Sequence, residues 1–153
     1  MVQVVAACCA GSVALPDPGS VVYVRAGVPI GGDGLSWATA LPDVQSGIDL
    51  ADALGAEVWL AEGVYVPSGS ARTSSFTLRG GVVIRGGFRG FEHSATQARP
   101  ESFLSVLSGD RTGDGPSSDD LYAVVTPAPG SSATLDGVVV RGGRGDGSGA
   151  PND

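Results

Sequence analysis

The 153-residue sequence contains no lysine and a single histidine, and its nine basic residues are all arginines. Aspartate and glutamate outnumber them, so the net charge is -7. A nucleic-acid-binding domain needs a basic surface that meets the phosphates, and attraction to an anionic membrane needs a basic cluster. The charge balance therefore argues against nucleic acid as a partner and against a basic membrane-binding segment.

Cysteine is nearly absent: Cys8 and Cys9 are the only two, and adjacent cysteines are poorly placed to form a disulfide with each other. Both lie in an uncharged apolar stretch, residues 1–15, which is too short to span a bilayer as a helix. Its composition is typical of a secretory signal, and residues 5–8 (VAAC) loosely resemble a bacterial lipoprotein signal. We predict that residues 1–20 are a leader, and that the protein is secreted or sits at the outer cell surface, with attachment as a lipoprotein as one route.

Aromatic residues are also scarce, at 6%, whereas 25 glycines and ten prolines indicate many turns. With 42% hydrophobic residues the chain can still fold around a core, and its length fits one domain. Residues 81–87 (GVVIRGG) recur as residues 137–143 (GVVVRGG), and residues 21–27 are a weaker copy. Self-similarity at long period is typical of solenoids, in which short strands stack on one another.

Further short strands are predicted where β-branched and aromatic runs lie between turn residues. These are residues 57–61, 63–66, 75–78, 105–107, 122–126 and 133–135. The chain then ends in a glycine-rich tail, residues 144–153, with no closing strand or helix. We expect this tail to be truncated, and the last strand to leave an open solenoid end that favours self-association.

One amphipathic helix is predicted over residues 41–55, because apolar residues recur there with a helical period. They are Leu41, Val44, Ile48 and Ala51. Gly55 suits the end of the helix, whereas Gly47 in its interior costs about 1 kcal/mol relative to alanine. We expect this helix to cover the first coil, whose strand edges would otherwise be unpaired.

Nine segments, in this order, resemble the N-terminal portion of right-handed parallel β-helix proteins with the pectin-lyase-like fold, of a secreted bacterial type. They are residues 22–24, 32–38, 41–55, 57–65, 72–78, 86–92, 97–100, 107–110 and 135–138. The resemblance implies that residues 21–143 are the N-terminal coils of a β-helix domain. The expected fold is therefore an all-β, right-handed parallel β-helix fragment with a short N-terminal capping α-helix.

The densest carboxylate run is the acidic loop, residues 110–120. Its candidate metal ligands are Asp110, Asp114, Asp119 and Asp120. Hard oxygen ligands on a glycine-containing loop suit Ca²⁺, although the spacing is not that of an EF-hand. A solvated loop of aspartate turns is the alternative. No other cofactor and no disulfide is expected.

No catalytic residue is predicted. Polysaccharide lyases on the resembled fold use Ca²⁺ and a basic residue, and Arg85 and Arg141 end the two strong repeat copies. Arginine is a poor base because its pKa lies above about 12, so pairing with carboxylates is the expected role of both side chains. His93, the only histidine, lies in a polar run and is expected in a solvated loop.

The aromatic side chains have two interpretations, core packing or a platform on which sugar rings stack, and core packing is preferred. The residues concerned are Trp37, Trp59, Tyr65 and Phe88. The leading functional hypothesis is an exported structural or interaction scaffold without catalysis, whose partner is a polysaccharide or another cell-surface protein. The alternative is the N-terminal part of a pectate-lyase-like carbohydrate-active enzyme or a carbohydrate-binding protein. A fold alone does not choose between them, because function resides in sites.

Overall fold

The computed structural model describes residues 20–145, which form three parallel β-sheets, one α-helix and two short 3-10 helices. Residues 1–19 of the predicted leader and residues 146–153 of the glycine-rich tail lie outside the described residues. Sheet A contains β1 (Val21–Val24), β2 (Glu57–Ala61), β5 (Val83–Phe88) and β8 (Thr134–Asp136). Sheet B contains β3 (Gly63–Tyr65), β6 (Ser105–Ser108) and β9 (Val138–Arg141), and sheet C contains β4 (Phe76–Leu78) and β7 (Val125–Pro127). No helix in residues 20–145 has the length and apolarity needed to cross a membrane.

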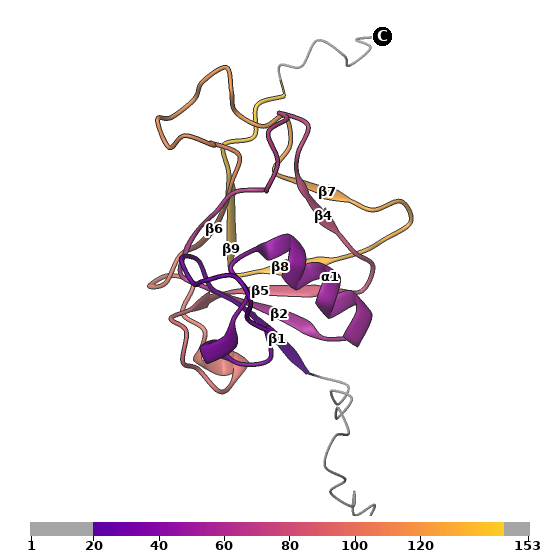
Figure 1. Ribbon diagram of the computed structural model, residues 1–153, viewed down its shortest axis with the longest axis vertical. Coiled ribbons are helices and arrows are strands. Elements are labelled where there is room, and N and C mark those ends of the chain that lie inside the picture. Colours follow the sequence, from indigo (N-terminus) through magenta and orange to yellow (C-terminus); the bar gives the residue numbers. More distant parts are fainter. Residues whose placement is uncertain (1–19, 146–153) are drawn as a thin grey trace, which may run out of the picture.

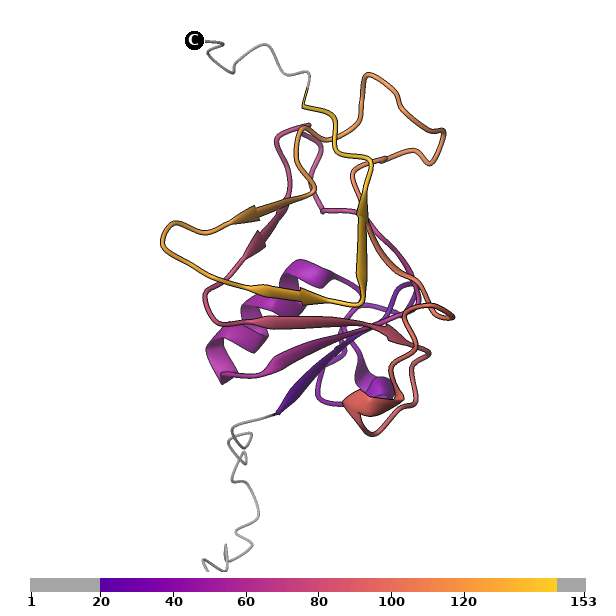
Figure 2. The same cartoon turned by 180° about the vertical axis from the view of Figure 1, so that it is seen from behind.

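The chain visits the three sheets in the same order on each pass: β2, β3 and β4, then β5, β6 and β7, then β8 and β9. Every pairing between these strands is parallel. β7, β8 and β9 lie on three sides of a roughly triangular outline (Figures 1 and 2). The structure is therefore mostly parallel sheet and compatible with a solenoid-like fold. It is not all-β, because its α-helix contributes to the core.

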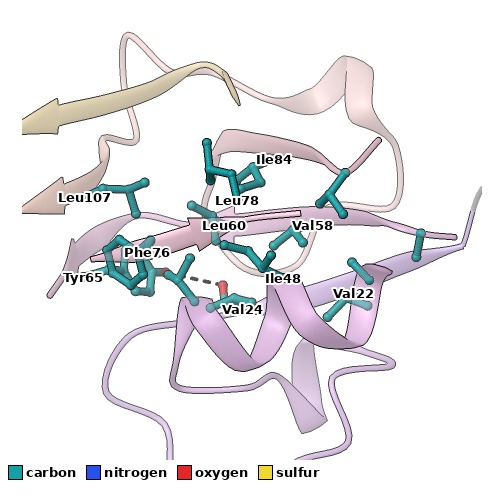
Figure 3. Close-up of a cluster of buried hydrophobic side chains, with 14 of the residues drawn as sticks. Val22, Val24, Ile48, Val58, Leu60, Tyr65, Phe76, Leu78, Ile84 and Leu107 are labelled. Atoms are coloured by element: carbon teal, nitrogen blue, oxygen red, sulfur yellow. Dashed lines mark hydrogen bonds between the residues drawn. The ribbon is translucent and has the colours of Figure 1, made fainter. Parts of the chain in front are cut away.

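The core occupies the space between the sheets, and alternate residues of each strand point into it (Figure 3). In sheet A the parallel register places Val22 beside Val58, Val58 beside Ile84, and Ile84 beside Leu135. The first three of these side chains are fully buried. Each inward side chain thus stacks on its counterpart in the neighbouring strand, which explains why β-branched runs recur along the chain.

The helix α1 (Val44–Leu54) begins three residues later than the predicted start. Leu41 instead pairs with β1, since its N–H donates to the Tyr23 carbonyl (2.9 Å) and its carbonyl accepts from the Arg25 N–H (2.9 Å). Asp43 then caps the helix, because its Oδ2 accepts from the Ser46 N–H at 2.9 Å. Gly55 ends it in the left-handed conformation, as predicted.

The apolar face of α1 packs on the core, which confirms the predicted buried face. Ile48 is fully buried and points from the helix toward β2, the strand that carries Val58 and Leu60 (Figure 3). The polar side chain of Gln45 also contributes, because its Oε1 accepts from the Thr77 N–H (2.7 Å) and its Nε2 donates to the Thr77 carbonyl (3.3 Å). Gln45 therefore takes the place of a neighbouring strand at the free edge of β4.

Gly47 lies where the helix comes closest to β1. A Cβ added there would lie 2.5 Å from Cγ2 of Val24 and 3.7 Å from Cγ1 of Val58. The glycine that lowers helix propensity is thus the residue that allows the helix to approach the sheet.

The strong sequence repeat does not mark equivalent positions in the structure. Residues 83–87 belong to β5 in sheet A, whereas residues 138–141 form β9 in sheet B. The strand predicted at residues 122–126 is also partly wrong, because β7 begins at Val125. Tyr122 lies before this strand, and its N–H donates to the Arg72 carbonyl (2.9 Å). This hydrogen bond connects two loops and does not extend a sheet.

We predict that Gly47→Ala destabilises the fold, although helix propensity alone favours alanine by about 1 kcal/mol. The new methyl group meets Val24, and overpacking of this kind costs about 1–3 kcal/mol. Urea unfolding measures the change, with Asp52→Ala on the exposed side of α1 as the control. The control stays within about 0.5 kcal/mol of the parent. A more stable Gly47→Ala variant would contradict the close approach.

Candidate functional site

The acidic loop connects β6 to β7 and lies against the chain that follows β9 (Figures 1 and 2). The Gly109 N–H donates to the Arg141 carbonyl (2.8 Å), and the Arg144 N–H donates to the Leu121 carbonyl (2.8 Å). The acidic loop and residues 141–144 line an open cleft of about 680 Å³. Its charged lining residues are Asp110, Asp120, Arg141 and Arg144.

Two of the four predicted ligands organise the turn of the loop. Asp110 accepts from the Gly113 N–H through Oδ1 (2.6 Å) and from the Gly115 N–H through Oδ2 (3.1 Å). Asp114 accepts from the Thr112 hydroxyl at 2.7 Å. These local bonds are those of the alternative interpretation, a loop of aspartate turns.

Asp119 and Asp120 share the neighbouring Ser117. The Ser117 hydroxyl donates to Asp119, and this bond lowers the pKa of the Asp119 carboxyl from its ordinary value. The Ser117 N–H donates to Oδ2 of Asp120 at 2.9 Å. Asp120 is only 2% exposed, and its Oδ1 is buried without a hydrogen-bond partner among residues 20–145. A buried oxygen of this kind is costly unless something satisfies it.

The four aspartates do not converge on one point. Within the described part of the chain, no three histidine, cysteine, aspartate or glutamate side chains form a group that could hold a metal ion. Only Asp110 and Asp120 line the same cleft. Calcium therefore stays a prediction, and these two residues, with backbone oxygens, are the ones that could take part in it.

Arg85 and Arg141 lie in different sheets. Arg85 is on the outer face of sheet A, where its Nε is 3.0 Å from Oε2 of Glu57 and its Nη1 donates to Oδ2 of Asp136. The hydrogen bond and charge of Glu57, followed by the charge of Asp136, raise the pKa of Arg85 further. The predicted pairing with carboxylates is confirmed for Arg85, and a protonated guanidinium held this way cannot act as a base.

Core packing is confirmed for three of the four aromatic residues. Tyr65 belongs to the main core, where its hydroxyl donates to the Ala61 carbonyl (2.9 Å) and burial raises its pKa. Trp59 and Phe88 are buried outside that core, and their rings are stacked with centroids 4.5 Å apart. Trp37 extends this ring cluster to the surface, because its ring centroid is 5.9 Å from that of Phe88 and its side chain is only partly buried.

A second hollow, the aromatic pocket, has a volume of about 370 Å³. It lies where β1, the segment with the 3-10 helix Trp37–Thr39, and the turn before the 3-10 helix Ala95–Gln97 come together (Figures 1 and 2). Its lining includes Tyr23, Leu35, Trp37, Phe91 and His93. The predicted solvated position of His93 is confirmed, since the residue is exposed, but the residue also borders this pocket.

Glu92 holds the turn beside the aromatic pocket, and sequence reasoning gave it no role. Its buried carboxylate accepts from the N–H groups of Arg89 (2.7 Å), Gly90 (2.9 Å) and Phe91 (3.0 Å). Its backbone carbonyl accepts from Nε1 of Trp37 at 2.9 Å. Burial alone would raise the pKa of Glu92, but these N–H groups outweigh burial and hold the pKa below its ordinary value of 4.5. The glycines that precede Glu92 predict a turn, but they do not identify a buried carboxylate that holds it.

We predict that Glu92→Gln destabilises the protein by about 1–3 kcal/mol near neutral pH, because a neutral amide replaces a carboxylate that accepts three N–H groups. The lowered pKa means that the stabilisation by Glu92 is present above pH 4.5 and is lost as the pH falls through the folded-state value. The stability difference between the two proteins should therefore shrink in acid. Urea unfolding at a series of pH values measures it.

Glu101→Gln is the control for this experiment, because Glu101 is exposed and has no hydrogen bond from its side chain to the other described residues. Its stability should follow that of the parent protein at every pH. A stability difference for Glu92→Gln that is absent at neutral pH, or that grows in acid, would contradict the assigned role.

No protein-family model, no curated protein and no solved structure matches the chain. The resemblance to pectin-lyase-like proteins therefore stays a prediction that depends on the nine sequence segments.

Proposed function

We propose that residues 21–143 are the first coils of a right-handed parallel β-helix, which acts outside the cell as a structural or interaction scaffold without catalysis of its own. The observation that carries this proposal is the repeated passage of the chain through three parallel sheets in one fixed order. The apolar composition of the predicted leader supports export.

The first strands of sheets A and C are covered, which supports a solenoid that begins at this end. The outer edge of β1 is paired, because the Tyr23 N–H donates to the Gly34 carbonyl (2.8 Å) and Leu41 pairs with the same strand. Gln45 covers the edge of β4. These contacts protect strand edges that would otherwise pair with other chains.

The last strands of the three sheets, β7, β8 and β9, form the opposite end of the stack. β7, β8 and β9 each pair with one strand only within the described residues. Val139 and Val140 of β9 are exposed there. Such an edge, next to apolar side chains, is suited to receive a further coil or a strand of a partner protein. The scaffold role depends on this edge.

We predict that the 153-residue chain self-associates through this end, and that Val140→Arg shifts it toward the monomer. Val140 stacks beside the buried Leu107 in the register of sheet B, so a charge there opposes the docking of another strand. Size-exclusion chromatography with light scattering measures the molar mass. Val64→Arg is the matched control, because Val64 is exposed in β3 at the opposite end of the same sheet. A monomeric parent protein would refute the docking edge.

The second candidate is the N-terminal part of a carbohydrate-active enzyme or of a carbohydrate-binding protein. The observation in its favour is the unsatisfied Oδ1 of Asp120 in a cleft that also contains Asp110 and Arg141. A cation between the two carboxylates would satisfy that oxygen, and arginine is suited to the carboxylate groups of an acidic glycan.

We expect Ca²⁺ to bind no more tightly than in the millimolar range, because too few carboxylates converge in the cleft. Calorimetric titration measures the affinity in the parent and in Asp120→Asn, with Asp114→Asn as the control outside the cleft lining. The chain should also release no unsaturated product from pectate. A micromolar site that Asp120→Asn abolishes and Asp114→Asn retains, or measurable lyase turnover, would favour the second candidate over the scaffold.

A further inference from the structure

The walls of the aromatic pocket are fixed without any ligand. The Trp37 indole is held at its nitrogen by the Glu92 carbonyl (2.9 Å) and packs edge-on against Tyr23, with ring centroids 4.8 Å apart. The buried rings of Trp59 and Phe88 support these two from below. A ligand that enters would not have to order these side chains, and preorganisation of this kind favours affinity.

The rim of the pocket is apolar and exposed. Phe91 is 61% exposed and Leu35 is 54% exposed, and both contribute to the lining. Two large apolar side chains at the mouth of one hollow create a surface that gains from contact with an apolar face of a ligand.

Polar groups at the pocket remain available for a ligand. The hydroxyl of Tyr23 and the imidazole ring of His93 make no hydrogen bond to any other residue of the described chain. The carboxylate of Glu92, in contrast, is occupied by three backbone N–H groups. The pocket thus combines aromatic faces with a few hydrogen-bonding groups, which is the usual composition of a small-ligand site.

Charge narrows the class of ligand. No arginine is among the lining residues, although the Arg89 guanidinium lies 5.8 Å from the centroid of the Phe91 ring. The chain carries a net charge of -7, and the lining itself offers an anionic ligand no ion pair. A cationic ligand would find no available carboxylate in the lining, because the carboxylate of Glu92 already accepts three backbone N–H groups of its turn. A neutral ligand with an apolar face and hydroxyl groups at its edge fits these observations.

We propose that the aromatic pocket binds a neutral sugar unit of a glycan, with the C–H face of the ring against Trp37 and Phe91 and its hydroxyl groups toward Tyr23 and His93. This site deepens the carbohydrate-binding candidate by naming a place and a ligand class, but it is separate from the acidic cleft. With a volume of about 370 Å³, it is at the small end of ligand pockets and suits a short glycan segment.

The test is calorimetric titration of the full chain with cellobiose and with maltose, with tryptophan fluorescence as a second readout. At least one of these neutral sugars should bind, in the millimolar range. Phe91→Ala should weaken binding by about threefold to tenfold, the equivalent of one lost aromatic contact. Tyr23→Phe keeps the ring and removes the hydroxyl, and it should also weaken binding.

The matched control pair is Leu35→Ala and Leu104→Ala, because both side chains are 54% exposed and only Leu35 lines the pocket. Leu35→Ala should weaken binding, and Leu104→Ala should not. Thermal unfolding of each variant confirms that the fold is retained. The proposal is overturned if neither sugar binds, if the pocket variants bind like the parent, or if choline or digalacturonate binds more tightly and loses that affinity in Phe91→Ala. Digalacturonate held in the acidic cleft would keep its affinity in Phe91→Ala. None of these results bears on self-association, so the scaffold proposal fails or stands separately.

Discussion

Parallel strands need a partner at the first edge of a sheet, and helix α1 with the segment before it supplies that partner for sheets A and C. The backbone of residues 34–41 pairs with β1, and the amide of Gln45 bonds to both backbone groups of Thr77 in β4. The close approach of the helix depends on Gly47, since a Cβ there would collide with Val24. Val22 and Val58 of sheet A lie in the same cluster as the buried residues of the helix, so the stack of sheet A begins against this cover (Figure 3).

The elements that could be predicted from the sequence are those defined by local pattern. The helix was found because its buried residues recur with a period near 3.6, and strands such as β2 were found because turn residues bound a β-branched run. The start of the helix was missed because Leu41 is used by β1, which is a tertiary contact. The sequence repeat wrongly suggested that its two copies occupy equivalent positions in the fold, for a related reason. A β-branched run that ends in Arg-Gly-Gly describes a strand and a turn, and it carries no information about which of the three sheets that strand joins.

The candidate sites were less predictable, because their contacts connect distant parts of the chain. The acidic loop could be found from composition, and Asp110 and Asp114 behave as local turn residues. The aromatic pocket depends on a hydrogen bond between Trp37 and Glu92, which are 55 positions apart in the sequence. Nothing in the sequence near Glu92 distinguishes a buried carboxylate that holds a turn from an ordinary surface glutamate. The sequence predicts Tyr23 only as part of a strand. Its place in the pocket lining depends on neighbours that are distant in the sequence.

The spacing between equivalent strands explains where these sites lie. Val58 and its partner Ile84 are 26 residues apart, whereas Ile84 and its partner Leu135 are 51 residues apart, although both pairs are neighbours in one sheet. The stacked core accepts only short strands, so the additional residues must leave it as loops. The turn with Glu92 and the acidic loop are two such excursions, and each borders one of the two hollows. The uniform interior therefore sets the position of the loops, and the loops carry the residues that can recognise a ligand.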